Sequence, residues 1–525
     1  MMTDTIINNL PAEGLRVVMR SLLAAHPEVT HSFEAETQKY IEETALPTLE
    51  ARQPDPSLIG LKRIQQIIRC MLGCGLCYRA LPVARDLVNH ALVLLTSKDA
   101  GLDSDVSDFL ASVDGDIVQS VTAIQKTLFV SSGMRELSVH EKVLVEELHQ
   151  SLMDCCKQAV ERGLDCPYGR ALSATSSLLG LSQLEDTELH STLAAMYVKQ
   201  PVQTSDTFEM GGKRLPRIFS GLWQLSSPAW GSASAPKIFA QFAKHVESGF
   251  SAFDMADHYG DAEIIFGRFR SAFPHGNSIF AATKYCVFHP MTVTKDAVRA
   301  NVTERCQRLG SDKVDLLQFH WQFYADPQYL DALRYLAEDE RVSALGLCNF
   351  DTEHLEAALS NGIRFSLIDS RPMIRMGEVC DRHNVKLLTY GTLCGGFLAD
   401  KWLGKPEPDL YNESITPSQR KYHGMIRSWG TWALFQELLT VLQNIGMKHK
   451  ASISNVATRW VLDFPYVGAV IVGVRMGISE HTKENLASLG WRLDENDQTS
   501  IDAVLRRSRR LEMFDAMGDC GGEYR

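Results

Sequence analysis

The sequence lacks any run of about 18 or more apolar residues, which is the length that a membrane-spanning helix needs. It also lacks an N-terminal basic segment followed by an apolar core, since it begins Met1-Met2-Thr3-Asp4. The first absence argues against a transmembrane helix and the second against a secretory signal peptide. We therefore expect a cytoplasmic protein with no membrane partner.

Charge of one sign is not concentrated anywhere along the chain. The formal net charge is -11, and it is spread without long acidic or basic blocks. A basic face of the kind that binds nucleic acid is therefore not expected. The content of 45% hydrophobic and 22% charged residues is typical of a globular protein, and the charge says little about small-molecule substrates.

Cysteine and histidine spacing gives little sign of a metal site. The 12 cysteines form no compact disulfide framework, so we expect reduced thiols. Cys70, Cys74 and Cys77 have the spacing C-x-x-x-C-x-x-C, which resembles an iron-sulfur motif, but an apolar helical pattern surrounds them. That setting favours a structural role for the three thiols. His258 and His289 have no paired ligand spacing, and we predict no metal.

The chain divides into two parts with different patterns of apolar residues. A length of 525 residues exceeds what one hydrophobic core usually fills. Up to about residue 197, apolar residues such as Val18 and Leu22 recur at helical spacing and strand signals are nearly absent. A stretch with few apolar anchors follows and contains Gly211-Gly212. We predict an all-helical domain over residues 1–198, a linker over 199–214 and a second domain over 215–525.

Short apolar or β-branched runs alternate with amphipathic segments after Arg214, which is typical of repeated βα units and a parallel sheet. Eight runs are candidate strands, the number in a (β/α)8 barrel: Arg217–Trp223, Gly249–Phe253, Ile279–Thr283, Val314–Gln318, Val342–Leu347, Ile363–Ile368, Val385–Thr389 and Val467–Val472. The predicted class is therefore α/β, a TIM barrel preceded by an all-α domain. Such a barrel carries its chemistry at the C-terminal ends of the strands.

Polar residues follow four consecutive predicted strands at the end where chemistry is expected. Asp254 follows the second run, Lys284 the third, His320 the fourth and Asn349 the fifth. The loop after the second run continues to Tyr259, which we expect to face the barrel mouth.

A tyrosine could donate a proton at this mouth if a cation stood beside it. A phenol titrates near pH ~10, so proton donation near neutrality needs help from a group such as Lys284. Asp254 would hold that ammonium ion, and His320 would orient a carbonyl oxygen. Each residue alone also has an ordinary explanation, since charges after strands are commonly solvated and tyrosine or histidine is commonly packed.

The combination resembles the aldo-keto reductase family, whose pattern is F-D-T-A-x-x-Y-G, then T-K, then a strand ending in L-H, then G-x-S-N-F. The matching stretches are Phe253–Gly260, Thr283-Lys284, Gln318–Trp321 and Gly346–Phe350. Their order and spacing agree, and the similarity extends over about residues 215–525. Cys348 stands where many members have serine.

The resemblance implies an NADPH-dependent reduction of an aldehyde or ketone, or the reverse oxidation, with Asp254, Tyr259, Lys284 and His320 as the catalytic tetrad. Tyr259 would be the proton donor. Asn349 would bind the nicotinamide carboxamide and Tyr390 would stack on its ring. The adenosine end would meet the remaining positions that match the family: Gly473, Arg475, Glu484 and Asn485. The guanidinium of Arg475 favours NADPH, although NADH is an alternative.

The sequence departs from the family at the sixth strand, where members carry a glutamine that binds the nicotinamide amide. Two alignments are possible. If Phe365-Ser366 matches the family's Tyr-Ser, the residues that should form the sixth strand are missing. If the sixth strand is instead Ile363–Ile368, Asp369 takes the position of the glutamine. The departure leaves an alternative function open. The chain could be a catalytically weakened cofactor-binding or scaffold protein whose helical domain contacts a protein partner.

Overall fold

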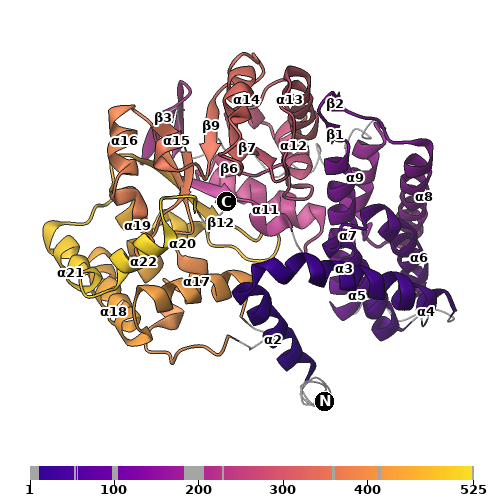
Figure 1. Cartoon of the computed structure of the whole chain (residues 1–525), viewed down its shortest axis with the longest axis horizontal. Coiled ribbons are helices and arrows are strands. Elements are labelled where there is room, and N and C mark those ends of the chain that lie inside the picture. The colour runs from indigo at the N-terminus through magenta and orange to yellow at the C-terminus, as the bar shows by residue number, and fades with distance from the viewer. Residues whose placement is uncertain are drawn as a thin grey trace.

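The computed structural model describes residues 11–51, 55, 57–96, 104–181, 206–226, 230–356, 361–410 and 415–522. A largely helical part and a barrel with its surrounding helices lie side by side (Figure 1). Within the described residues, no helix combines the length and the apolar character that crossing a membrane requires.

The N-terminal part is built from helices packed around their own core. Ala84, Leu87, Val88 and Ala91 of one helix are fully buried in that core. The principal helices are α2 (Ala12–Ala25), α3 (Thr30–Tyr40), α4 (Leu46–Ala51), α5 (Leu58–Gly73), α6 (Cys77–Thr96), α7 (Ser104–Thr127), α8 (Val139–Glu161) and α9 (Gly169–Leu178), with a short hairpin of β1 (Phe129–Val130) and β2 (Gly133–Met134) after α7. The prediction of an N-terminal helical region is confirmed, apart from this hairpin.

The apolar face predicted around Val18 and Leu22 does form on a helix, but it does not enter the core. The exposed fractions are 49% for Val18 and 54% for Leu22, because α2 lies outside the bundle that α5 to α9 form. Cys70 ends up exposed in α5, Cys74 partly buried after it and Cys77 buried at the start of α6.

The structure corrects the expectation that all cysteines are reduced. Cys156 in α8 and Cys166 before α9 form a disulfide, with their Cα atoms 4.6 Å apart. The chain reverses direction between the two helices and so brings the two thiols together. Sequence spacing alone does not reveal this reversal.

Part of the stretch predicted as a linker, residues 207–214, belongs to an antiparallel hairpin of β3 (Thr207–Met210) and β4 (Lys213–Pro216). Gly211 and Gly212 make its turn with φ values of 57° and 72°, a conformation that favours glycine at both positions. Phe208 from this hairpin packs on Phe219 at the N-terminal end of the barrel, with ring centroids 6.2 Å apart.

Eight parallel strands close into a barrel in the order β10-β11-β12-β5-β6-β7-β8-β9. The strands are β5 (Ile218–Gly221), β6 (Ala252–Asp254), β7 (Phe280–Val287), β8 (Leu316–Trp321), β9 (Leu345–Cys348), β10 (Asn361–Arg364), β11 (Leu387–Tyr390) and β12 (Val467–Gly473). The predicted (β/α)8 barrel is confirmed, and the alignment that removed its sixth strand is wrong because β10 pairs with both β9 and β11.

The sixth strand lies earlier than the predicted Ile363–Ile368. Beyond Arg364 the chain makes a tight turn, in which the Ser366 hydroxyl accepts hydrogen bonds from the backbone N–H groups of Ile368 and Asp369. Ser366 N–H also donates to the Asp369 carbonyl, so these residues bond among themselves. The apolar character of the segment reflects burial rather than strand pairing.

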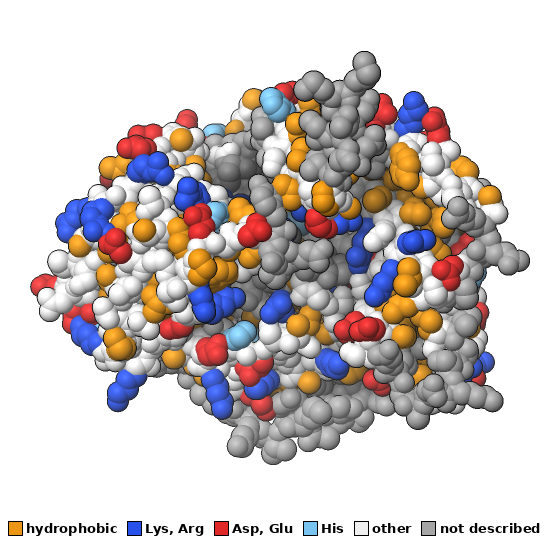
Figure 2. All heavy atoms as spheres, turned by 90° about the horizontal axis from the view of Figure 1, so that it is seen from below, with side chains coloured by type: hydrophobic (Ala, Val, Ile, Leu, Met, Phe, Trp, Pro, Cys, Tyr) orange, Lys and Arg blue, Asp and Glu red, His pale blue; other side chains and the backbone are white. Residues whose placement is uncertain are grey.

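Helices and loops surround the barrel and supply most of the second core. They are α11 (Ala235–Glu247), α12 (Ala262–Ala272), α13 (Lys295–Leu309), α14 (Gln328–Ala337), α15 (Thr352–Glu356), α16 (Met376–Arg382), α17 (Pro417–Trp429), α18 (Trp432–His449), α19 (Ile453–Leu462), α20 (Thr482–Leu486), α21 (Glu495–Leu505) and α22 (Arg510–Met517). The helical part meets this ring where α9 contacts α12 and the β1-β2 hairpin contacts α13. On the face drawn in Figure 2, basic and acidic side chains are interspersed.

Replacing Phe208 with alanine tests the role of the β3-β4 hairpin. The ring also covers Gly468 of β12, where an added Cβ would lie 2.6 Å from it, so its loss uncovers the barrel floor. We expect Phe208→Ala to lower the free energy of unfolding of the barrel by about 1 to 3 kcal/mol. Urea unfolding followed by tryptophan fluorescence measures this change. Glu209→Ala, at an exposed position on the same strand, is the control, and equal midpoints for the two variants would contradict the proposed role.

Candidate active site

A buried ammonium ion joins three of the four residues expected at the barrel mouth. Lys284 Nζ lies 2.7 Å from Asp254 Oδ2 and donates to the Met255 carbonyl at 2.8 Å. The same ammonium nitrogen lies 5.1 Å from the ring centroid of Tyr259. Gln318, from β8, donates to Asp254 Oδ1 at 2.9 Å and fixes the carboxylate from its other side. Strands β6, β7 and β8 therefore hold the ion pair directly beside the tyrosine.

A row of aromatic contacts runs from the tyrosine to the fourth residue. The His258 ring lies edge-on to Tyr259, with centroids 4.8 Å apart, and edge-on to Phe288 at 5.0 Å. Phe288 in turn lies 5.5 Å from His320. The structure thus brings all four predicted catalytic residues to one region, with His258 and Phe288 between Tyr259 and His320.

Burial and neighbouring charge set the protonation of these groups in opposite directions. Burial raises the pKa of Tyr259 above its usual value, and the Lys284 ammonium opposes that effect. Burial alone would lower the pKa of Lys284, but the interactions with Asp254, Tyr259 and Cys348 together outweigh this effect and keep the pKa above its usual value. Burial, with a smaller contribution from His258, lowers the pKa of His320 to about 4. At neutral pH the site holds a charged lysine, a neutral histidine and a protonated tyrosine.

Cys348 places a thiol in the same environment. It is 6% exposed, and burial raises its pKa to about 12, so it is a neutral side chain at physiological pH. The thiol therefore adds no charge beside Lys284, and in this respect it resembles the serine of other sequences.

Asn349 and Tyr390 are the residues expected to bind a nicotinamide. They lie after β9 and at the end of β11, and they contact each other. The Tyr390 hydroxyl donates to Asn349 Oδ1 at 2.8 Å. Asn349 follows β9 with a φ of 59°, a left-handed conformation that asparagine tolerates better than most residues. The strand ends of β9 and β11 thus present an amide and an aromatic ring together.

Asp369 does not face an open site in the way that the sequence hypothesis required. Its side chain is fully buried, and Arg371 binds both carboxylate oxygens, from Nε and from Nη2, at 2.9 Å each. Arg364 lies 3.6 Å away as a second cation. The proposal that this carboxylate takes over the role of the family's glutamine is therefore not supported.

Arg371 instead holds the C-terminal segment against the strand ends, a feature that sequence reasoning missed. Its Nη1 donates to the carbonyls of Gly518 and Asp519 at 3.2 and 2.9 Å. The Asp519 carboxylate accepts from Thr352 N and Oγ1, each at 2.9 Å. At Gly521 an added Cβ would lie 2.2 Å from the Asn349 carbonyl oxygen, so the segment lies directly on this residue. No motif in the sequence signals the contact.

The residues expected at the adenosine end lie at the end of β12 and in the loop and helix that follow it. Gly473 ends β12, and an added Cβ there would lie 2.3 Å from the Gln224 side chain. Arg475 is exposed, and within the described part of the chain its guanidinium forms no ion pair. Glu484 pairs with His481 at 2.6 Å on the surface, and Asn485 lies beside it in α20. An exposed guanidinium of this kind can receive a phosphate.

One group of potential ligand atoms lies near the mouth. Asp257, His258 and Cys286 offer atoms within 4.8 Å of one another. The Asp257 carboxylate, however, already contacts Lys126 and Arg305, and two cations beside it disfavour a third. The arrangement is better suited to an ion-pair network than to a metal ion.

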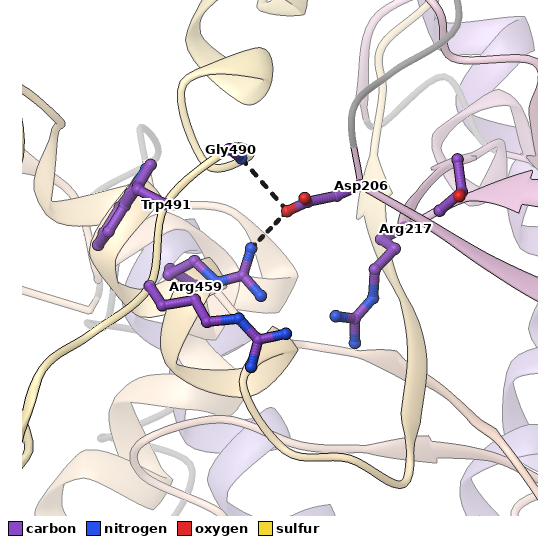
Figure 3. A pocket seen from close by; sticks show the side chains of 7 residues that line it. Asp206, Arg217, Arg459, Gly490 and Trp491 are labelled. Atoms are coloured by element: carbon purple, nitrogen blue, oxygen red, sulfur yellow. Dashed lines mark hydrogen bonds and ion pairs between the residues drawn. The ribbon is translucent and has the colours of Figure 1, made fainter.

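A separate cavity of about 450 Å³ lies beside the hairpin at the opposite end of the barrel (Figure 3). In it, Asp206 accepts from Arg459 at 2.7 Å and from the Gly490 N–H at 3.3 Å. Arg217 donates to the carbonyls of Val467 and Gly468 at the start of β12. These contacts fasten the hairpin and the barrel floor, and they involve none of the residues at the mouth.

Comparison with known proteins assigns the family. The model described as "Aldo/keto reductase family" matches residues 217–506, more than half of the chain. The protein therefore belongs to the aldo/keto reductases, a family of nicotinamide-dependent oxidoreductases. The match begins at the barrel and leaves the helical part outside it.

The sequence relatives agree with this assignment. The chain is 24% identical over 321 residues to aldo-keto reductase YhdN of Bacillus subtilis, which covers 57% of this chain and 92% of that protein. It is 24% identical over 339 residues to the chloroplastic pyridoxal reductase of Arabidopsis thaliana, and this match covers 57% of this chain and 86% of that protein. Among solved structures, the glycerol dehydrogenase AKR11B4 of Gluconobacter oxydans aligns with a TM-score of 0.48 and 23% identity, over 58% of this chain and 97% of that one.

The lowered pKa of His320 predicts a pH effect on stability. In the folded protein this pKa falls from 6.5 to about 4, so the folded state resists protonation that the unfolded chain accepts. Its contribution to stability is complete above pH ~6.5 and is lost as the pH falls toward ~4. The wild type and His320→Gln are compared at pH ~7 and pH ~4.5. The free energy of unfolding of the wild type should fall by roughly 2 to 3 kcal/mol more over this interval than that of His320→Gln, which has no ring to titrate. Urea unfolding at the two pH values measures this difference, and parallel losses in both proteins would contradict it.

Proposed function

We propose that the protein reduces an aldehyde or ketone to an alcohol with NADPH, or catalyses the reverse oxidation. The observation that carries the proposal is the position of the Lys284 ammonium, buried between Asp254 and the Tyr259 ring. Burying an ammonium ion is costly unless it is paired, and this lysine contacts a single carboxylate on one side and the face of a phenol on the other. That arrangement serves proton donation by the phenol.

The residues of the mouth fit a nicotinamide cofactor in their chemistry. Asn349 offers an amide after β9 and Tyr390 an aromatic ring at the end of β11, and Arg475 offers an exposed guanidinium further along the rim. When bound, the nicotinamide supplies the hydride that reaches the carbonyl carbon. Gly473, Glu484 and Asn485 would line the adenosine end.

The chain's own residues would supply the proton and the orientation. Tyr259 would donate its hydroxyl proton to the carbonyl oxygen as negative charge develops there. The Lys284 cation would stabilise the phenolate that remains, and Asp254, held by Gln318, would keep that cation in place. His320, neutral at physiological pH, would hold the carbonyl oxygen by a hydrogen bond from its ring.

The choice between the two nicotinamide cofactors rests on Arg475. A guanidinium matches the geometry and charge of a 2'-phosphate, which NADPH has and NADH lacks. NADH is a realistic alternative, because one relative in Escherichia coli, 22% identical over 337 residues, is described as an NADH-specific methylglyoxal reductase.

Binding of NADPH, followed by nicotinamide fluorescence, is the first test of the proposal. A saturable change on titration of the full chain is expected, and its absence would remove the reductase function. Binding without turnover on any aldehyde or ketone would favour the scaffold alternative. Two features are consistent with that alternative: the sequence has no match for the glutamine of the family's sixth strand, and Asp369 is buried against Arg371.

Tyr259→Phe tests the proton donor. The variant keeps the ring beside Lys284 but has no hydroxyl, so kcat for a reactive aldehyde should fall about 10²- to 10⁴-fold while NADPH affinity is retained. Tyr285→Phe is the matched control, because that hydroxyl contacts only Met291 among the described residues, at 3.5 Å, and lies outside the proposed machinery. Turnover in Tyr259→Phe equal to that of the control would take the role away from Tyr259.

Arg475→Met tests the cofactor preference. Without the guanidinium, the Kd for NADPH should rise about tenfold, and the Kd for NADH should stay the same because it has no 2'-phosphate. Fluorescence titration with each cofactor measures both constants. Arg492→Met, an exposed arginine at the distant cavity, controls for the loss of one positive charge. A similar change in Kd for both cofactors would show that Arg475 does not recognise the 2'-phosphate.

A further inference from the structure

The helical part of the protein contacts the loop that carries Tyr259. This loop, Met255–Asp261, connects β6 to α12. Helices α7 and α9 lie on the side of the helical part that faces α12 (Figure 1). The family match starts at residue 217, and YhdN is covered over 92% of its length by a match to 57% of this chain. The contacts described next therefore come from outside the family's common barrel.

The first contact is an ion pair to a fully buried carboxylate. Lys126, near the end of α7, pairs with Asp257 Oδ2, whose side chain is 0% exposed. The same oxygen accepts from the Cys286 N–H at 3.1 Å and lies 3.5 Å from Arg305 Nη1. The other oxygen contacts His258 Nδ1 at 3.2 Å. Asp257 therefore connects the helical domain to the histidine that packs on Tyr259.

The second contact is steric and lies on the other side of the tyrosine. Gly260 has a φ of 61°, and an added Cβ there would lie 3.0 Å from Gln119 Nε2 and 3.2 Å from Val118 Cγ1. Helix α7 thus packs against the backbone immediately after Tyr259. Arg308 of α13 links the same two elements, since it donates to the Gly260 carbonyl and to Gln125 Oε1 of α7, the latter at 2.7 Å.

The third contact is a two-pronged ion pair at the end of the loop. Arg170 of α9 donates to Asp261 from Nε at 2.9 Å and from Nη2 at 2.6 Å. The two side chains are 4% and 1% exposed, so the pair is shielded from water. Arg170 also donates to the Leu225 carbonyl in the neighbouring loop after β5, at 3.2 Å.

These contacts assign a role to the helical domain. We propose that Lys126 and Arg170 are positioning residues for the reductase reaction, which hold the loop on both sides of Tyr259 so that its hydroxyl meets the carbonyl oxygen. The inference rests on the proposed function. Lys126 is the more informative of the two residues, because it pairs with Asp257, which in turn contacts His258. The His258 ring packs directly on Tyr259. It also packs on Phe288, which contacts His320.

Removal of the Lys126 ammonium has a defined physical consequence. Asp257 would remain buried with Arg305 3.5 Å away and His258 as its nearest side-chain donor. A buried carboxylate that loses a cation draws more strongly on the partners that remain. The His258 ring would then move toward Asp257 and away from the edge of Tyr259. A shift of about 1 Å in a reacting group can reduce the rate by up to ~100-fold.

The experiment compares three variants of the full chain. Lys126→Met removes the charge, Lys126→Arg restores a cation, and Lys142→Met is the control. Lys142 belongs to the same domain but pairs with Glu146 at 3.7 Å on the surface, where both side chains are more than half exposed. Lys126 is itself 31% exposed, so its replacement should leave the protein folded, and thermal unfolding checks this for all three variants.

Two readouts are taken for each variant. Steady-state reduction of 4-nitrobenzaldehyde, with the NADPH Kd from fluorescence, separates catalysis from binding. Hydrogen-deuterium exchange of peptides covering residues 252–262 reports on the loop without requiring turnover. Lys126→Met should lower kcat about 10- to 100-fold with an unchanged NADPH Kd, and it should speed exchange in the loop. Lys126→Arg should recover most of both, and Lys142→Met should match the wild type.

Each outcome decides a separate question. Wild-type kcat in Lys126→Met would overturn the inference, and so would a loss of kcat with unchanged exchange, because the lysine would then not act through the loop. If the wild type neither binds NADPH nor turns over the aldehyde, the proposed function fails. Exchange then decides the positioning role alone: faster exchange in Lys126→Met supports it and unchanged exchange removes it.

Discussion

The burial of one ammonium ion constrains the whole mouth of the barrel. Lys284 carries its charge into a region where only 6% of the residue is exposed, and a charge in such a place is tolerated only with a close partner. Asp254 and the Met255 carbonyl meet that need, and Gln318 restrains Asp254 in turn. Three adjacent strands must therefore keep their register for the ion to stay paired. The geometry beside Tyr259 follows from this electrostatic requirement.

The loop that holds Tyr259 is fixed from outside the barrel as well as from within it. Its two carboxylates, Asp257 and Asp261, are buried and paired with cations of the helical domain, while Gly260 between them packs closely against side chains of α7. The two parts of the chain thus share buried charge, which couples their stability. The disulfide between Cys156 and Cys166 precedes Arg170 by a few residues and ties the start of α9 to α8.

Much of the barrel could be predicted from the sequence, because most of its strands are short apolar or β-branched runs that alternate with amphipathic helices. The proximity of Asp254, Lys284 and His320 could be predicted for the same reason, since chain order in such a barrel places them on neighbouring strands. The sixth strand was displaced in the prediction because hydrogen bonds of the Ser366 hydroxyl, which apolar patterning does not reveal, turn the chain after Arg364. The hairpin before the barrel was missed because its Gly211-Gly212 turn lies in a stretch with few apolar residues, which has the composition of a linker.

Contacts between distant segments could not be predicted. Lys126 and Asp257 are 131 positions apart, and Arg170 and Asp261 are 91 apart, so no local pattern connects them. The same holds for the C-terminal segment on Asn349, which depends on Gly521 and on the carbonyls that Arg371 binds. Such pairings follow from how the two parts of the chain pack together.

The hydrogen bond between Tyr390 and Asn349 bears on how a cofactor would gain its affinity. A carboxamide N–H that bonded to Asn349 Oδ1 would share an acceptor that the Tyr390 hydroxyl already uses at 2.8 Å, and a shared acceptor gives each hydrogen bond a smaller net gain in free energy. In the proposed site, contacts at the opposite end of the dinucleotide, near Arg475 and α20, would therefore weigh more in the dissociation constant, and the nicotinamide end would contribute chiefly orientation.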